Sequence, residues 1–195
     1  MFNDSINFVA QSIEKSQLVD RNGCYHQSLQ GFLPESLLRE LAKLNTSSCS
    51  VVKLEKQEHQ PRVRVDYSEA ISKKLNIIFK SSKIKNVLEH KYKLKLYPQT
   101  TDIWFDLGGY NLKPHTDDPR LALSLQIYLD TEKDIPGTAL YDAETDDTPF
   151  CIFKYVKNTG YSLLNNDRSW HGTEFIMNSD KIRKSIYIRY GTSPQ

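Results

Sequence analysis

The feature that most constrains the fold is a series of short apolar stretches that begins near residue 92 and continues almost to the end of the chain. In the clearest stretch, Leu121 to Leu129, every odd position is apolar, which is the period of a half-buried strand. Glycine, proline, aspartate and asparagine separate the stretches and favour turns. The other stretches are 92–96, 103–105, 138–141, 150–156, 161–164 and 184–190. Many short strands between turns predict a β-barrel or β-sandwich.

The first part of the chain has helical periodicity instead. A helix is predicted from Leu33 to Leu44, with Pro34 in its first turn and leucines at helical spacing. Ser68, and then Ser81 or Ser82, are candidate N-caps of two further helices. Residues 7–18 fit either a strand or a short helix. Strand-like runs are predicted at 51–54 and 62–66, with a polar loop at 55–62 between them.

We therefore expect one domain over all 195 residues, mostly β with N-terminal α-helices. Residues 1–91 would form a helical lead-in with supporting strands. Residues 92–195 would form the core that carries the functional site.

Composition narrows the classes of partner. The net charge is +2, from 26 basic and 24 acidic residues, and this balance argues against nucleic acid. The sequence has no run of about 20 apolar residues and no signal-peptide pattern at its start, which argues against a membrane. The three cysteines are widely spaced, without a Cys-x-x-Cys pair, and are expected to be free thiols. A cytoplasmic location is the prediction from these features.

One short polar segment and one distant residue suggest a metal site. In an extended segment, His115 and Asp117 point to the same side, so an imidazole and a carboxylate lie next to each other. Pro114 favours an extended conformation at Lys113 just before them. His171, which follows a separate strand-like run, would add a second imidazole. Two histidines and one carboxylate bind iron(II) on one face and leave other coordination positions open.

A second polar pair lies on the last predicted strand. Arg183 and Ser185 share one face of it, while Ile186, Ile188 and Tyr190 share the other. A guanidinium can hold a carboxylate by two parallel hydrogen bonds, and a hydroxyl on the same face can add a third. The pair is therefore a candidate site for an acidic co-substrate.

Each feature alone has an ordinary structural explanation. A His-x-Asp motif is common on polar strand faces. Asp117 fits a turn with Asp118 before Pro119, and His171 fits a histidine bonded to a neighbour. Lys184 and Arg189 fit an ordinary exposed strand face.

Taken in order, the motifs resemble the iron(II)- and 2-oxoglutarate-dependent dioxygenases, and most of all their prolyl-4-hydroxylase-like branch. The resemblance covers about residues 92–190. It rests on Gly109-Tyr110, Pro114-His115-Thr116-Asp117, Tyr128-Leu129, Gly137-Thr138, Gly160-Tyr161-Ser162-Leu163-Leu164, His171-Gly172 and Arg183-Lys184-Ser185. Animal prolyl hydroxylases hold the co-substrate with a lysine where this chain has Arg183.

The resemblance implies a double-stranded β-helix, also called a jelly roll or cupin-like fold. It implies that His115, Asp117 and His171 are the catalytic iron(II) ligands. Arg183 and Ser185 would bind the far carboxylate of 2-oxoglutarate, with Tyr110, or else Tyr128, as a further hydrogen-bond donor. The implied reaction uses O2, converts 2-oxoglutarate to succinate and CO2, and hydroxylates a substrate, with ascorbate as a candidate supporting reductant. The presence of Asp117 favours hydroxylation over halogenation.

The sequence leaves the substrate open among an amino acid, a peptide and a sugar, and leaves the oligomeric state open. Substrate contacts are expected from residues 100–106, 118–120 and 142–149, with Trp104 and Trp170 as walls and Arg120 as a surface residue. Two other classes of protein fit less of the pattern. One is a cupin-like protein that binds a metal or small molecule without catalysis. The other is an interaction module in which His115 and His171 lie far apart.

Overall fold

A computed structural model describes residues 2–44, 49–50 and 61–193, with the backbone alone for 49–50. The predicted strand at 51–54, and the predicted loop as far as residue 60, lie outside the described residues. The helices are α1 (Phe2–Lys15), α2 (Glu35–Ala42), α3 (Glu69–Phe79) and α4 (Ser82–Tyr92). The strands are β1 (Leu18–Arg21), β2 (Cys24–Gln30), β3 (Cys49–Ser50), β4 (Arg62–Val65), β5 (Tyr97–Leu107), β6 (Leu121–Tyr128), β7 (Thr138–Leu140), β8 (Cys151–Phe153), β9 (Thr159–Leu164), β10 (His171–Thr173) and β11 (Ile182–Gly191).

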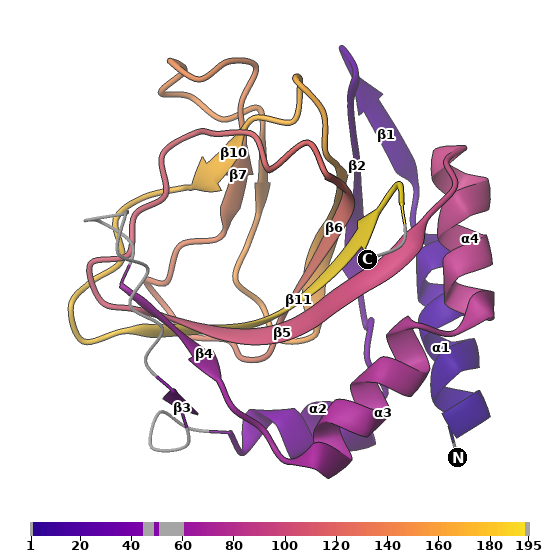
Figure 1. Ribbon diagram of the computed structural model, residues 1–195. Coiled ribbons are helices and arrows are strands. Elements are labelled where there is room, and N and C mark those ends of the chain that lie inside the picture. The colour runs from indigo at the N-terminus through magenta and orange to yellow at the C-terminus, as the bar shows by residue number, and fades with distance from the viewer. Residues whose placement is uncertain (1, 45–48, 51–60, 194–195) are drawn as a thin grey trace.

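The strands form two antiparallel sheets. The large sheet has the order β1-β2-β9-β6-β11-β5-β4-β3, and the small sheet has the order β10-β7-β8. In Figure 1 the helices lie outside the large sheet, and the small sheet lies on the sheet's other side. The expected mostly-β jelly roll with N-terminal helices is confirmed.

The helices begin where their capping residues predict. The hydroxyls of Ser68 and Ser81 accept hydrogen bonds from the backbone N–H groups of Ile71 and Ile84, each at 3.4 Å. Pro34 directly precedes α2, where its missing N–H costs no helical hydrogen bond. The ambiguous segment 7–18 is mostly helix, since α1 extends to Lys15.

Most of the predicted strands appear with shifted ends, and one is absent. The alternating segment 92–96 is not a strand, because α4 continues to Tyr92 and Lys93 then takes a left-handed conformation, with φ of 57°. The run at 103–105 is the inner part of the much longer β5. Hydrogen bonding to β11 along most of its length extends β5 through polar residues that local patterning leaves unassigned.

Strand alternation divides the interior into two parts. Ile186, Ile188 and Tyr190 of β11 pack in the larger hydrophobic core, together with residues of all four helices. Arg183 and Ser185, on the other face of β11, are also buried. A smaller apolar cluster, which includes Tyr110, lies on the small-sheet side. The large sheet thus presents its polar residues to the space between the sheets, where the candidate site lies.

No helix within the described residues is long and apolar enough to span a membrane. Cys24 and Cys151 carry free thiols, as expected.

Candidate functional site

The structure brings the three predicted metal ligands together from two separate segments. His115 lies in the connection between β5 and β6, and His171 is the first residue of β10. Their backbones pair mutually, with His115 N–H donating to His171 O at 3.0 Å and His171 N–H donating to His115 O at 2.9 Å. The expected strand at 115–117 is reduced to this single bridge. The bridge places both imidazoles on one side of the backbone.

A glycine permits this close approach of the two segments. A Cβ at Gly172 would lie 2.4 Å from the carbonyl oxygen of Leu112, so any side chain there would push the segments apart. Thr173 N–H also donates to Leu112 O, at 2.8 Å, and continues the pairing past the glycine. The His171-Gly172 dipeptide therefore positions the second histidine.

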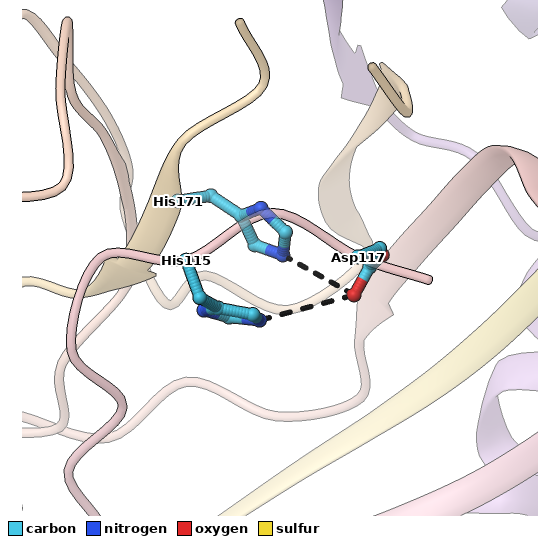
Figure 2. Close-up of side chains that lie close together, drawn as sticks. All are labelled: His115, Asp117 and His171. Carbon is cyan, nitrogen blue, oxygen red and sulfur yellow. Dashed lines mark ion pairs between the residues drawn. The ribbon is translucent and has the colours of Figure 1, made fainter. Parts of the chain in front are cut away.

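The three side chains converge on one point, as Figure 2 shows. Nε2 of His115 and Nε2 of His171 each lie 3.8 Å from Oδ1 of Asp117. One ligand atom from each residue lies within 4.8 Å of those from the other two. This spacing allows one ion to contact all three.

Backbone carbonyls fix both histidine tautomers. Nδ1 of His115 lies 3.0 Å from the carbonyl oxygen of Lys113, and Nδ1 of His171 lies 2.9 Å from that of Ser169. Because a carbonyl oxygen only accepts, each Nδ1 carries a proton, so the lone pair of the neutral imidazole is on Nε2. The lone pairs are on the atoms that face Asp117, which is the arrangement of metal-binding histidines.

Two further features of the site favour metal binding: the lowered pKa of His115 and the hydrogen bonds that orient Asp117. Burial, together with the neighbouring His171, lowers the pKa of His115 to about 4, so its imidazole is neutral at physiological pH. Ser124 donates its hydroxyl to Oδ2 of Asp117 at 3.2 Å, and the Asn165 side-chain amide donates to Ser124 at 3.0 Å. This chain of hydrogen bonds orients the carboxylate and leaves Oδ1 to face the histidines.

The three ligands line a cavity of about 240 Å³, which we call the triad hollow. Its walls include the aromatic rings of Trp104 and Tyr187, as expected for Trp104. Trp170 does not line this hollow. The complete lining is Arg62, Trp104, Leu112, His115, Asp117, Leu121, Ser124, His171, Tyr187 and Arg189.

The predicted pair on β11 lies deeper than this hollow. Arg183 and Ser185 are at most 1% exposed, and neither lines the triad hollow. Arg183 donates Nε to Oδ2 of Asp106 at 2.9 Å and Nη1 to the carbonyls of Pro136 and Gly137 at 3.2 and 3.1 Å. Among the described residues, its Nη2 has no hydrogen-bond acceptor. Ser185 accepts from the Gln126 amide at 3.1 Å, so its hydroxyl proton can be donated elsewhere.

A second arginine shares the same carboxylate. Arg62 on β4 donates Nε to Oδ1 of Asp106 at 3.0 Å, and its guanidinium stacks over Trp104 and Tyr110 at 4.7 and 5.1 Å. Arg62 lines the triad hollow, whereas Asp106 is fully buried. The inner charge layer formed by Arg62, Asp106 and Arg183 therefore carries one surplus positive charge.

The two candidate tyrosines, Tyr110 and Tyr128, differ in the hydrogen bonds that their hydroxyls make. The Tyr128 hydroxyl donates to Oγ1 of Thr138 at 2.8 Å and lies 3.3 Å from the carbonyl oxygen of Phe153. The buried Tyr110 hydroxyl has no hydrogen-bond partner in the described structure. Burial raises the pKa of Tyr110, so its phenol stays protonated and can donate. An unpaired buried phenol is costly, and a bound acceptor would satisfy it.

Sequence reasoning did not single out Arg62 or Asp106, and it treated Arg189 as surface. Tyr187 and Arg189 continue the face of β11 that begins with Arg183 and Ser185, so two-residue periodicity could have identified them. Arg62 and Asp106 meet only through the pairing of β4 with β5, which has no local sequence signal.

Comparison with solved structures agrees with this architecture. A prolyl hydroxylase from Trichoplax adhaerens, in complex with a peptide of hypoxia-inducible factor, is similar with a TM-score of 0.63 and 13% identity, over 96% of this chain and 89% of that one. A prolyl-4-hydroxylase from Pseudomonas putida has a TM-score of 0.58 and 14% identity, over 96% and 99%. HygX from Streptomyces hygroscopicus, with nickel, 2-oxoglutarate and hygromycin B bound, has a TM-score of 0.61 and 10% identity, over 86% and 83%.

No family model and no curated protein sequence matches this chain. At these identities the similarity shows the fold. The chain thus shares the jelly-roll fold of these solved structures, with a His-Asp-His cluster facing a hollow that residues of both sheets line.

Proposed function

We propose that this protein is an iron(II)- and 2-oxoglutarate-dependent dioxygenase that hydroxylates its substrate. The observation that carries the proposal is the convergence of Nε2 of His115, Nε2 of His171 and Oδ1 of Asp117 on one side of an open hollow. Two imidazoles and one carboxylate on one face are the donor set of non-haem iron(II) oxygenases.

The donor chemistry fits iron(II). Both imidazoles donate Nδ1–H to a backbone carbonyl and turn Nε2 toward Asp117, and the Asp117 carboxylate is oriented by Ser124. The hollow on the other side of the ligands leaves room for more ligands to the same ion. These features favour an open catalytic site over a closed structural one.

The inner charge layer fits the co-substrate. Its single surplus positive charge suits the far carboxylate of 2-oxoglutarate, with Arg183 and Ser185 as the proposed anchor and Arg62 beside them. Nη2 of Arg183, the Ser185 proton and the Tyr110 phenol are donors that a bound carboxylate could satisfy. The support for these roles is the set of unused donors around one buried aspartate.

Because Arg183 is buried, binding has to open a path to it from the triad hollow. Tyr187 lies two residues from Ser185 on the same face of β11 and lines that hollow. Tyr187 and Arg62 stack on each other in the wall of the hollow, and in this proposal their side chains move to connect the hollow to Arg183. The proposed binding is thus coupled to a local rearrangement.

The protein's own groups would position the reactants. Bound iron(II) would supply the activation of dioxygen and the oxidation of the 2-oxo acid to succinate and CO2. The carbonyls of Lys113 and Ser169 hold the imidazoles in place, and Ser124 holds the carboxylate. Trp104 and Tyr187 would restrict water in the hollow and press the substrate toward the metal ligands.

Succinate production tests the proposal directly. Purified protein with iron(II), ascorbate and 2-oxoglutarate should release succinate in air, and His171→Ala should abolish the release. Arg120→Gln is the matched control, because Arg120 lies outside the triad hollow and pairs with Asp118. Equal succinate release by the parent and His171→Ala would contradict the proposal.

A cupin-like protein that binds a metal without catalysis is the second candidate. The pairing of Arg183 with Asp106 favours it, because that arginine is already partly neutralised. This candidate predicts that the protein binds a metal but that 2-oxoglutarate does not raise its thermal stability.

A further inference from the structure

A second charge layer is formed by other residues of the same three strands, β4, β5 and β11, and it lies nearer the surface than the inner charge layer. Arg189 of β11 donates Nη2 to Oδ2 of Asp102 at 3.1 Å, and Nη1 of Arg64 lies 4.0 Å from the other oxygen of that carboxylate. The side chain of Asp102 is 18% exposed and that of Arg189 is 29% exposed. Two arginines again share one aspartate, so this outer charge layer also carries one surplus positive charge.

The outer charge layer contains donors that the protein leaves unused. Nε of Arg189 is buried and has no hydrogen-bond partner in the described structure. The nearby hydroxyl of Thr100 is also buried without a partner in the parts of the chain that the structure describes. A buried N–H of a guanidinium without an acceptor costs more than a neutral one, which favours an anionic ligand at this position.

Arg189 stands at the junction of two cavities. It lines the triad hollow, and it also lines a second hollow of about 450 Å³ together with Thr100, Arg120 and Leu121. Leu121 and Arg189 are the two residues that both linings share. A molecule that reaches from the metal ligands into the second hollow would therefore pass Arg189.

In the proposed co-substrate complex, Arg189 is not used by the metal or by 2-oxoglutarate and is available to the substrate. There, the far carboxylate neutralises the inner charge layer, while Asp117 and the near carboxylate offset a divalent ion. The outer charge layer keeps its surplus charge. Arg64 is half exposed and can be solvated, whereas the buried Nε of Arg189 still lacks an acceptor in that complex. A substrate that covers Arg189 is therefore favoured if it supplies a negatively charged acceptor.

We infer that the primary substrate carries a carboxylate that pairs with Arg189, and that the rest of the substrate extends into the second hollow. This inference rests on the proposed function. A single negative charge matches the single surplus charge, which favours a carboxylate over a phosphate monoester. Arg120 is a poorer partner, because it is exposed and already pairs with both oxygens of Asp118 at 3.0 Å.

Fluorine NMR with matched probes tests this inference. The probes are para-fluorobenzoate, para-fluorobenzamide and para-fluorophenyl phosphate, which differ mainly in charge and suit the aromatic walls of the triad hollow. Each is titrated into the protein loaded with zinc(II) and 2-oxoglutarate, and into the metal-free protein. The benzoate should bind about tenfold more tightly than the benzamide, which corresponds to about 1.4 kcal/mol.

Three variants test which residue causes the preference for benzoate over benzamide. Arg189→Gln should bring the benzoate and the benzamide to similar affinity. Arg21→Gln should leave the preference unchanged, because Arg21 pairs with Asp142 and lines neither hollow. Asp102→Asn should strengthen benzoate binding several-fold, because it removes the carboxylate that competes for Arg189. A loss of binding in Arg189→Gln could result from misfolding, but a gain of affinity in Asp102→Asn could not.

The outcomes separate this inference from the proposed function. Absence of acid-selective binding, or its survival in Arg189→Gln, would overturn the carboxylate site. Tighter binding of the phosphate than of the benzoate would overturn the choice of carboxylate. If 2-oxoglutarate fails to bind while benzoate still binds through Arg189, the oxygenase proposal fails and the anion site stands.

Discussion

Arg183 and Asp106 form an ion pair in the interior, with Nε of the arginine 2.9 Å from Oδ2 of the aspartate. Both side chains are almost fully buried, and Arg62 contacts the other oxygen of the same carboxylate. One aspartate thus holds two arginines, of which Arg62 lines the same hollow as the candidate metal ligands.

Replacing that aspartate should destabilise the protein strongly. Asp106→Asn leaves two guanidiniums without a counter-charge in the interior, and the expected loss in the free energy of unfolding is about 3–5 kcal/mol. Urea unfolding measures it. Asp118→Asn is the control, because Asp118 pairs with Arg120 at the surface and its loss should have no measurable effect. Equal stability of the two variants would contradict the account of the inner charge layer.

Tyr110→Phe separates ligand binding from stability. The Tyr110 hydroxyl has no partner in the described structure, so its removal should not lower the stability of the ligand-free protein. If the hydroxyl donates to 2-oxoglutarate, the variant should bind 2-oxoglutarate about 2- to 10-fold more weakly. Calorimetric titration measures the affinity.

Tyr128→Phe should show the opposite behaviour. Its hydroxyl is bonded to Thr138, so the variant should lose about 1 kcal/mol of stability. Its affinity for 2-oxoglutarate should be unchanged. Weaker binding in Tyr128→Phe alone would mean that Tyr128, and not Tyr110, contacts the co-substrate.

Removing the Ser124 hydroxyl should weaken metal binding without removing a ligand. Ser124→Ala frees Oδ2 of Asp117, so the carboxylate loses its orientation, and the affinity for iron(II) should fall about 10-fold. Anaerobic titration with a competing chelator measures the affinity. An unchanged affinity would show that the backbone alone positions Asp117.

The metal-free protein should lose stability as the pH falls from 6.5 to about 4. The pKa of His115 is lowered from 6.5 to about 4 by burial and by His171, so in this window the unfolded chain binds a proton that the folded chain does not. The contribution is complete above pH 6.5 and is lost as the pH approaches 4. Urea unfolding across this window should show that the free energy of unfolding depends less steeply on pH in His115→Gln than in the parent protein. Burial also lowers the pKa of His26, which contributes with the same sign in both proteins.

Local patterns predicted α2, α3, α4 and most strands because their signals are short-range, whereas α1 was left open between a helix and a strand. Ser68 and Ser81 cap helices through contacts three residues away, and the apolar alternation of β6 is visible in the sequence. The candidate metal ligands were also predictable as a group, since the His-x-Asp motif and His171 each carry their chemistry in the residue type, and the structure brings them together.

The charge layers were not predictable, because they depend on strand register. Arg62 meets Asp106 only when β4 pairs with β5, and Arg183 meets it only when β11 pairs with β5. The depth of Arg183 below the hollow likewise follows from packing between the two sheets. A single sequence shows that Arg183 is a strand residue but not that an aspartate already holds it.

Anaerobic binding of 2-oxoglutarate to the iron(II) protein is the measurement that tests the central claim most directly. The parent should bind 2-oxoglutarate only with the metal present. His171→Ala should lose this metal dependence, and Arg183→Lys should bind at least about tenfold more weakly, because lysine cannot reproduce the paired hydrogen bonds of a guanidinium. Absence of binding by the parent, or binding unaffected by the loss of Arg183, would contradict the proposed co-substrate site.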